Sequence, residues 1–295
     1  METEAVRGLV YGPSGKRLDV YRPVGVGGAA GVAGAARPAR DAEPAGDARP
    51  ARDAGPAGNA QPSEDARPSG DARLSPAPGP APTVLLWHGI GPDERDVLEP
   101  LARATAALGA LVLVPDWRSD APDGGRSQLL ESVAFLRKEA GGLGGDEASC
   151  VLAGWSAGAG AALGVALRPE SVAEWRPGAV VGIAGRYDLP ARTTGTAPLD
   201  DLAAGRDPGV PVHLLHGTRD TVVDAQCSRA LTEALRAAGR TVTLQEPDTD
   251  HAGVIMTAYD PAADRCVPTT AEQAVRAGRL AAEALAGAGG GGGVA

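Results

Sequence analysis

The chain has 295 residues, of which 43% are hydrophobic and only 3% aromatic, so we expect a sizeable core built mainly from Leu, Val and Ala. A net charge of -9 argues against nucleic-acid binding, which requires a basic surface. No apolar run is long enough to predict a membrane span. The absence of a secretory pattern at the N-terminus and three scattered cysteines favour the cytoplasm.

The first segment with a structural pattern is an expected antiparallel strand pair. Residues 6–11 and 17–21 are rich in strand-forming side chains, and the turn sequence Gly-Pro-Ser-Gly separates them at 12–15. Residues 25–82 then carry a degenerate 12-residue repeat made of Ala, Pro, Gly and charged residues. Because these units lack apolar side chains that stacking could bury, we expect a disordered insertion there.

After the insertion, short apolar runs alternate with helical patterns. Apolar runs typical of parallel strands covered on both faces occupy 83–89, 110–116, 149–155, 179–185, 210–217 and 241–247. Helical periodicity is present at 93–109, at 129–136, at 157–167, at 224–239 and from Thr269 onward, where Glu272 completes a capping-box pattern.

This alternation predicts an α/β fold with a mainly parallel eight-stranded sheet and helices on both faces. We expect one domain formed by residues 1–24 and 83–286, interrupted by the insertion. The Gly-rich segment 287–295 is expected to be a flexible tail.

A candidate nucleophile lies between a strand and a helix, in the sequence Gly154-Trp155-Ser156-Ala157-Gly158. A tight strand-to-helix turn exposes such a serine, and Gly154 and Gly158 would relieve crowding at that turn. An ordinary Gly-rich turn with a serine at the helix N-terminus gives the same local pattern. The remaining members of a catalytic triad therefore have to decide between the two interpretations.

His251 is the best candidate for the general base. A serine hydroxyl is a weak nucleophile and needs a base within hydrogen-bonding reach. Of the four histidines, His88, His213 and His216 lie in or at the end of strand runs, where buried structural roles are expected. His251 follows the last strand in a polar loop.

The base also needs a carboxylate that fixes its tautomer. Asp220 follows a strand at the carboxyl edge of the expected sheet and is the first choice. Asp224 is an alternative, although it opens a helical pattern and is explained more simply as an N-cap. Asp188, which follows the strand at 179–185, is the third candidate.

Stabilisation of a tetrahedral intermediate requires two backbone N–H donors. The residue after the nucleophile, Ala157, would supply one. The turn after the strand at 83–89 would supply the other, through Ile90 or Gly91.

The motifs along the chain are, in order, the HG turn at 88–89, the GxSxG motif, the HGxxD turn at 216–220 and, after them, His251. This order of motifs resembles that of the α/β-hydrolase superfamily. The segments RLDVYRPV, LLWHGIG and VPDWR are similar to its esterase and lipase branch, related to acetyl esterases and hormone-sensitive-lipase-like enzymes. The HG segment departs from that branch at Ile90, where further glycines are usual. The resemblance implies ester or amide hydrolysis through an acyl-enzyme, without a metal or an organic cofactor.

The expected substrate is a small ester. Family members insert a lid between the strands at 179–185 and 210–217, and here the connection 186–209 has room for only one short helix. The fold does not fix the leaving group, so a peptidase, an amidase or a thioesterase are alternatives. From a different class, a non-catalytic binding protein with this fold is also considered, and the oligomeric state is left open.

Overall fold

The computed structural model describes residues 1–24 and 80–289. Residues 25–79, where most of the repeat insertion is predicted, lie outside the described residues, as do residues 290–295 of the predicted tail. Strand β3 begins at Ala81, two residues before the predicted domain boundary, and helix α6 extends to Gly289, three residues past it.

The described chain forms an eight-stranded sheet with the order β1-β2-β4-β3-β5-β6-β7-β8. Strands β1, β2 and β4 pair antiparallel, and all other neighbours pair parallel, which confirms the predicted fold class. The strands are β1 (Thr3–Tyr11), β2 (Lys16–Pro23), β3 (Ala81–Trp87), β4 (Leu111–Pro115), β5 (Gly145–Trp155), β6 (Ala179–Ile183), β7 (Val212–Leu215) and β8 (Val242–Gln245).

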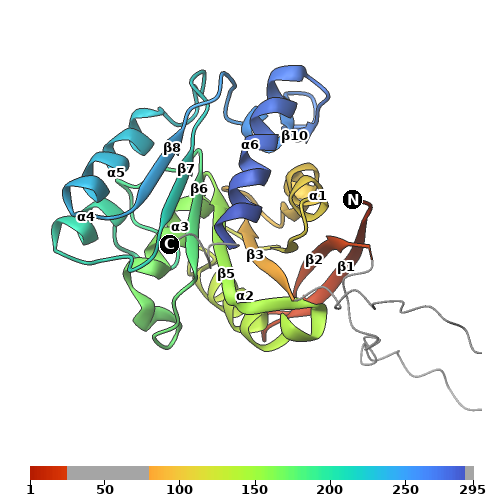
Figure 1. Ribbon diagram of the computed structural model, residues 1–295, viewed down its shortest axis with the longest axis horizontal. Coiled ribbons are helices and arrows are strands. Elements are labelled where there is room, and N and C mark those ends of the chain that lie inside the picture. Colours follow the sequence, from red (N-terminus) through yellow and green to blue (C-terminus); the bar gives the residue numbers. More distant parts are fainter. Residues whose placement is uncertain (25–79, 290–295) are drawn as a thin grey trace, which may run out of the picture. The chain divides into compact units, whose positions relative to one another are not determined.

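Helices cover both faces of this sheet (Figure 1). The α-helices are α1 (Glu99–Ala107), α2 (Arg126–Glu139), α3 (Ala157–Leu167), α4 (Pro198–Ala203), α5 (Gln226–Ala237) and α6 (Glu272–Gly289). Side chains of α2, α3, α4 and α5 share one apolar core, whereas those of α1 and α6 share the other. The short helix α4 is the only α-helix within the connection 186–209, as predicted.

Alternation of side chains along the central strands explains the two cores. In β3, Leu85 and Trp87 point into one core while Val84 and Leu86 point into the other. All four are fully buried, as period-two geometry requires for a strand covered on both faces.

Two helices start later than their sequence patterns predict. The segment 93–109 divides into a 3₁₀ turn η1 (Arg95–Leu98) followed by α1, with Pro100 in the first turn of α1. Proline lacks an N–H and fits there, because first-turn N–H groups have no partner within the helix. Helix α6 begins at Glu272 rather than Thr269, and the Thr269 hydroxyl accepts a hydrogen bond from Ala271 N–H instead of forming the capping box.

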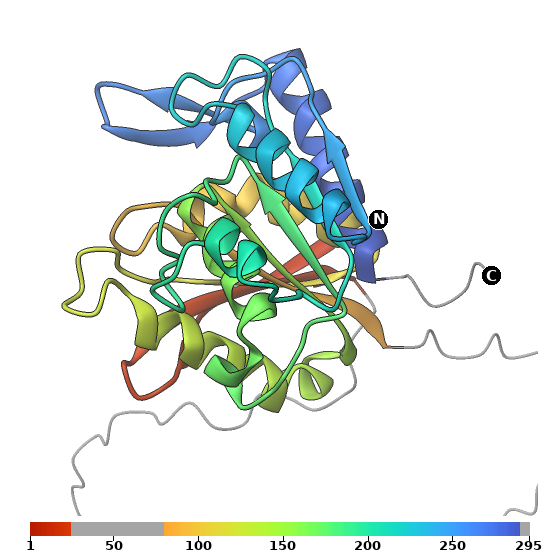
Figure 2. The same cartoon turned by 90° about the vertical axis from the view of Figure 1, so that its left-hand side faces the viewer.

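A second, two-stranded sheet was not predicted. It is a hairpin of β9 (Thr257–Asp260) and β10 (Arg265–Pro268), placed between His251 and α6. The hairpin projects from the body of the described chain near the N-terminal end of α6 (Figure 2). Its position makes it a wall of the candidate site described below.

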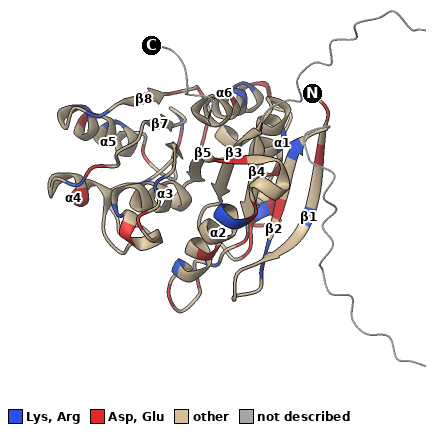
Figure 3. Cartoon of the chain, turned by 60° about the horizontal axis from the view of Figure 1, so that its bottom comes forward, with Lys and Arg blue, Asp and Glu red and all other residues tan. Residues whose placement is uncertain are grey.

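Acidic and basic residues are interspersed on the helices and loops of the described chain (Figure 3). None of the helices in residues 1–24 and 80–289 is long and apolar enough to cross a membrane.

Candidate active site

The sequence-predicted site residues converge at the carboxyl ends of the parallel strands. Ser156 follows β5, Ile90 follows β3, Asp220 follows β7 and His251 follows β8. In open α/β sheets this edge is where ligands bind, because loops from neighbouring strands meet there.

Ser156 has a strained backbone at the turn from β5 into α3. Its φ of 56° and ψ of -120° lie in a region that residues with a Cβ rarely adopt. The tight turn from β5 into α3 also leaves no room for side chains two residues away on either side. A Cβ on Gly154 would lie 2.1 Å from the Gly158 carbonyl carbon, and one on Gly158 would lie 2.5 Å from the Trp87 carbonyl oxygen.

His251 and Asp220 are joined by a short hydrogen bond. His251 Nδ1 lies 2.6 Å from Asp220 Oδ2, and a carboxylate only accepts, so Nδ1–H donates. This leaves Nε2 as the unprotonated nitrogen of a neutral ring, which is the tautomer that a general base needs.

Asp220 is held by three further donors. Its Oδ1 accepts N–H groups from Val222 and Val223 at 2.9 and 2.8 Å. His216 Nε2 lies 3.2 Å from Oδ2 and also 2.9 Å from the carbonyl oxygen of Val223, so it carries a proton and donates. Burial raises the pKa of Asp220, but hydrogen bonds from His216, His251 and Val223 outweigh it and hold the pKa well below its ordinary value.

The place of His216 at a strand end predicts a buried structural role. It is fully buried, as expected, and its Nδ1 accepts a hydrogen bond from the Ser228 hydroxyl at 2.8 Å. Its contact with Asp220 was not foreseen. The spacing of four residues in the HGxxD turn is the signal that could have suggested it.

The two alternative acids are engaged elsewhere. Asp224 Oδ1 accepts the N–H of Gln226, the first residue of α5, although Ala225 and not Asp224 is the N-cap residue of this helix. Asp188 forms a two-pronged ion pair with Arg186 at the surface. Neither carboxylate hydrogen bonds to His251.

Trp155, the residue before the candidate nucleophile, contacts His251 in two ways. Its indole N–H donates to the backbone carbonyl of His251 at 3.0 Å, and the two rings lie 4.9 Å apart at a tilt of 38°. The same residue therefore connects the turn at Ser156 to the loop that carries His251. The sequence gives no sign of this link between Trp155 and His251, which lie 96 residues apart.

Ser156 and His251 line one cavity of about 490 Å³, a size typical of small-ligand sites. No hydrogen bond joins the two side chains within the described residues, as is common before substrate binds. The other walls come from the turn after β3, the loop after β7 and the hairpin β9–β10.

The candidate oxyanion donors differ in whether their N–H groups already form hydrogen bonds. Gly91 N–H donates to the Ser119 hydroxyl at 3.2 Å, so it is already engaged. Neither Ile90 N–H nor Ala157 N–H has an acceptor among the described residues. Ala157 is also the first residue of α3, where N–H groups are unpaired and the helix dipole favours negative charge.

The turn that carries Ile90 is fixed from below by His88. This fully buried ring stacks on Trp117, and its Nε2 accepts N–H groups from Glu94 and Trp117. Nδ1 lies 3.0 Å from Gly89 O and therefore carries the proton. Burial lowers the pKa of His88 to about 4, which keeps the ring neutral.

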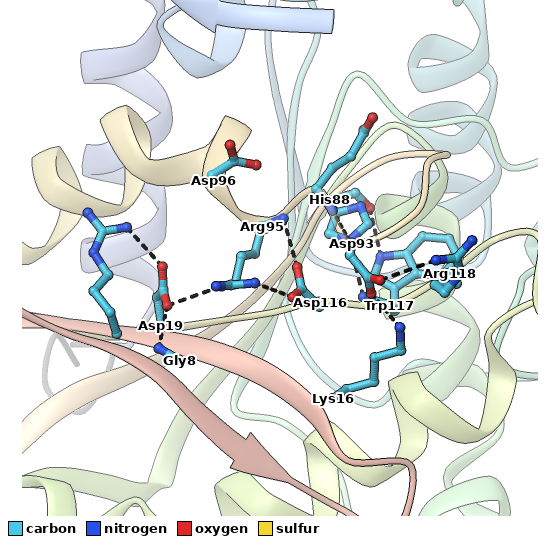
Figure 4. Close-up of polar contacts among 12 residues, drawn as sticks. Gly8, Lys16, Asp19, His88, Asp93, Arg95, Asp96, Asp116, Trp117 and Arg118 are labelled. Atoms are coloured by element: carbon cyan, nitrogen blue, oxygen red, sulfur yellow. Dashed lines mark hydrogen bonds and ion pairs between the residues drawn. The ribbon is translucent and has the colours of Figure 1, made fainter.

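A buried ionic network continues this support (Figure 4). Arg95 pairs with Asp116 at the end of β4 and, at 3.1 Å, with Asp19 in β2. Both carboxylates are almost completely buried. The network ties the segment after the HG turn to two strands of the sheet.

In the described part of the chain, His, Cys, Asp and Glu side chains do not gather in groups of three or more that could hold a metal ion.

Comparison with known proteins connects this geometry to a fold. No family model and no curated protein matches the chain. Among solved structures, a putative dienelactone hydrolase from Klebsiella pneumoniae is similar with a TM-score of 0.57 and 18% identity, covering 97% of this chain and 99% of that one. An esterase of Pyrobaculum calidifontis gives 0.56 and 16%, covering 97% and 85%. A Rhizomucor miehei esterase gives 0.60 and 13%, covering 98% and 85%.

The chain has the α/β-hydrolase fold. The eight-stranded sheet, the strained strand-to-helix turn after β5 and the similarity to these solved structures all lead to this class.

Proposed function

We propose that the chain is a serine hydrolase that cleaves small carboxylic esters, with Ser156 as nucleophile, His251 as general base and Asp220 as the supporting acid. The observation that carries the proposal is the His251–Asp220 hydrogen bond of 2.6 Å beside the strained Ser156, with Ser156 and His251 lining one cavity.

The reaction begins when Ser156 Oγ attacks the ester carbonyl carbon while His251 Nε2 takes the hydroxyl proton. The tetrahedral intermediate collapses to an acyl-enzyme, and His251 returns the proton to the departing alkoxide. A water molecule then attacks the acyl carbon, His251 accepts its proton, and Ser156 regains it as the acid leaves. Asp220 keeps His251 in the correct tautomer and stabilises the imidazolium without being protonated.

We assign the oxyanion hole to the N–H groups of Ala157 and Ile90. Both are free of other acceptors among the described residues, whereas Gly91 N–H is bonded to Ser119. Preorganised N–H donors at this place stabilise the developing negative charge. The His88 contacts support the rigidity of the turn that presents Ile90.

The decisive experiment is labelling of the full chain with a fluorophosphonate, followed by mapping of the modified residue. We expect Ser156 to be labelled, and Ser156→Ala to lose both labelling and turnover of p-nitrophenyl acetate by several orders of magnitude. Ser127→Ala, which changes an exposed serine on α2, is the matched control. Turnover above a few per cent in folded Ser156→Ala would refute the assignment.

A further inference from the structure

The mouth of the cavity carries an unusual set of exposed apolar side chains. Ile90, Val222 and Tyr259 are 65%, 72% and 57% exposed, and all three line the cavity. They come from three different segments, namely the turn after β3, the loop after β7 and strand β9. An apolar rim of this kind is suited to contact aliphatic groups of a ligand.

Beside the turn that carries Ile90 and Gly91, the cavity holds one carboxylate that has no hydrogen-bond or ion-pair partner among the described residues. Glu94 lines the cavity, and a Cβ on Gly91 would lie 2.3 Å from its carboxyl carbon, so the carboxyl group rests on the turn. Neither oxygen of Glu94 takes part in a hydrogen bond or an ion pair among the described residues. The side chain does not cap η1, which begins at the next residue.

The other charged groups of the cavity are already engaged. Asp250 accepts the Gly253 N–H at 2.7 Å, and Asp264 accepts the Tyr259 hydroxyl at 2.5 Å. Arg265, the one basic side chain in the lining, donates to Asp96 at 2.7 Å. With three carboxylates against one paired guanidinium, the cavity favours a positive charge and disfavours a negative one.

The environment of Glu94 is costly for a lone carboxylate. Burial raises the pKa of its carboxyl above the ordinary value, Arg265 lowers it, and Asp96 and Asp264 raise it again. A cation bound beside it would restore favourable interactions to the ionised form. The Glu94 carboxylate would therefore be stabilised more by a positively charged ligand than by solvent in the cavity.

We propose that Glu94 selects esters that carry an ammonium group, with the aliphatic substituents of that group resting on Ile90, Val222 and Tyr259. This inference rests on the proposed function of the same cavity, because it places the cation next to the reacting ester. It names a substrate class that neither the fold nor the triad specifies.

The test compares pairs of esters with the same shape and different charge. Acetylthiocholine and 3,3-dimethylbutyl thioacetate differ by a quaternary nitrogen in place of a carbon on the leaving side. The p-nitrophenyl esters of betaine and of 3,3-dimethylbutanoic acid make the same comparison on the acyl side. We expect the cation-to-neutral ratio of kcat/KM to fall about tenfold in Glu94→Gln for at least one pair, the lower end for a charge-assisted contact.

Glu233→Gln is the control, because it removes the same charge from the exposed face of α5 and should leave the ratio as in the wild type. A ratio that changes less than twofold in Glu94→Gln for both pairs would overturn the inference. So would a wild-type enzyme that turns over the neutral ester of each pair better after correction for intrinsic reactivity.

A binding measurement separates failure of the inference from failure of the proposed function. Calorimetric titration of the full chain with choline needs no turnover, and we expect its affinity to drop about tenfold in Glu94→Gln. Undiminished choline binding in that variant, or no binding to the wild type, counts against the cation site. Loss of Ser156-dependent turnover of every ester, with choline binding intact, would count against the hydrolase alone.

Discussion

At the scale of single residues, the Asp220 carboxylate accepts four hydrogen bonds while its side chain has no exposed surface. An isolated buried carboxylate would be destabilising, and these four donors offset that cost, so Asp220 can stay ionised although it is buried. The two histidines differ in their use. His251 faces the cavity, whereas His216 is enclosed between Ser228 and the Val223 carbonyl.

This arrangement predicts a large effect of Asp220→Asn. The amide would present an N–H group to one of its present donors, so His251 would be held in the wrong tautomer or left unsupported. We expect kcat for p-nitrophenyl acetate to fall by roughly 10⁴. Asp224→Asn and Asp188→Asn are matched controls and should change kcat far less, since their carboxylates bind Gln226 and Arg186. A large decrease in kcat in either control would mean that Asp224 or Asp188, rather than Asp220, is the supporting acid.

His88 predicts a pH dependence of stability. Its pKa is lowered by burial to about 4, against 6.5 for an ordinary histidine, so between these values the unfolded chain binds more protons than the native one. Stability is therefore lost as the pH falls through this window. From pH 7 to pH 5 we expect the wild type to lose about 2 kcal/mol of unfolding free energy more than His88→Gln.

Urea unfolding of both chains at the two pH values measures this difference, because all other titrating groups are common to both and cancel. Equal losses in the two chains would show that the native fold does not lower the pKa of His88.

The identity of the candidate triad could be inferred from the sequence, but its supporting contacts could not. Ser156, His251 and Asp220 are each marked by local surroundings, namely a Gly-flanked elbow, a polar loop and a strand end. The contacts of Trp155 with His251 and of His216 with Asp220 depend on how loops from different strands meet. Nothing in the local pattern encodes these distances.

At the scale of elements, the hairpin β9–β10 shows where sequence patterns become weak. The central strands were predictable because burial on both faces gives apolar runs. Each hairpin strand has only four residues, and all of them except the buried Thr257 are exposed or half-buried, so their composition differs little from that of a loop. The Asp-Pro turn between 260 and 264 was the available signal.

The hairpin also bounds the size of substrate that the cavity can hold. Each buried CH₂ contributes about 0.8 kcal/mol, or roughly fourfold in kcat/KM, until the cavity is full. With about 490 Å³ available and no large insertion at 186–209, we expect p-nitrophenyl esters from acetyl to butyryl to be preferred over octanoyl.

The measurement is kcat/KM of the wild type and of Tyr259→Ala for p-nitrophenyl esters of increasing acyl-chain length. In Tyr259→Ala, kcat/KM should increase less with acyl-chain length, because the substitution removes part of the apolar rim. Leu189→Ala, an exposed side chain of the 186–209 connection outside the cavity, is the control. Activity that keeps increasing to ten carbons would replace the small-ester proposal with a lipase-like one.

At the scale of the whole molecule, both flanks of segment 25–79 are anchored at one turn. The Arg22 guanidinium donates to the Leu143 carbonyl at 3.4 Å, and Ala81 N–H donates to the Gly144 carbonyl at 3.0 Å. The end of β2 and the start of β3 are therefore close in space. All proposed site residues lie outside this segment.

We therefore predict that a short Gly/Ser linker can replace residues 25–79 without loss of the hydrolase. The linker has only to join two points held at the same turn, and the entropic cost of closing a loop grows slowly with its length. Ser156-dependent kcat/KM should stay within about twofold of the full chain, because β1 remains paired with β2 and β2 with β4. Kinetics and thermal unfolding of both chains test this. If the shortened chain still unfolds cooperatively but has lost turnover, the segment takes a direct part in catalysis. If the shortened chain shows no cooperative thermal unfolding, the segment is part of the folded domain.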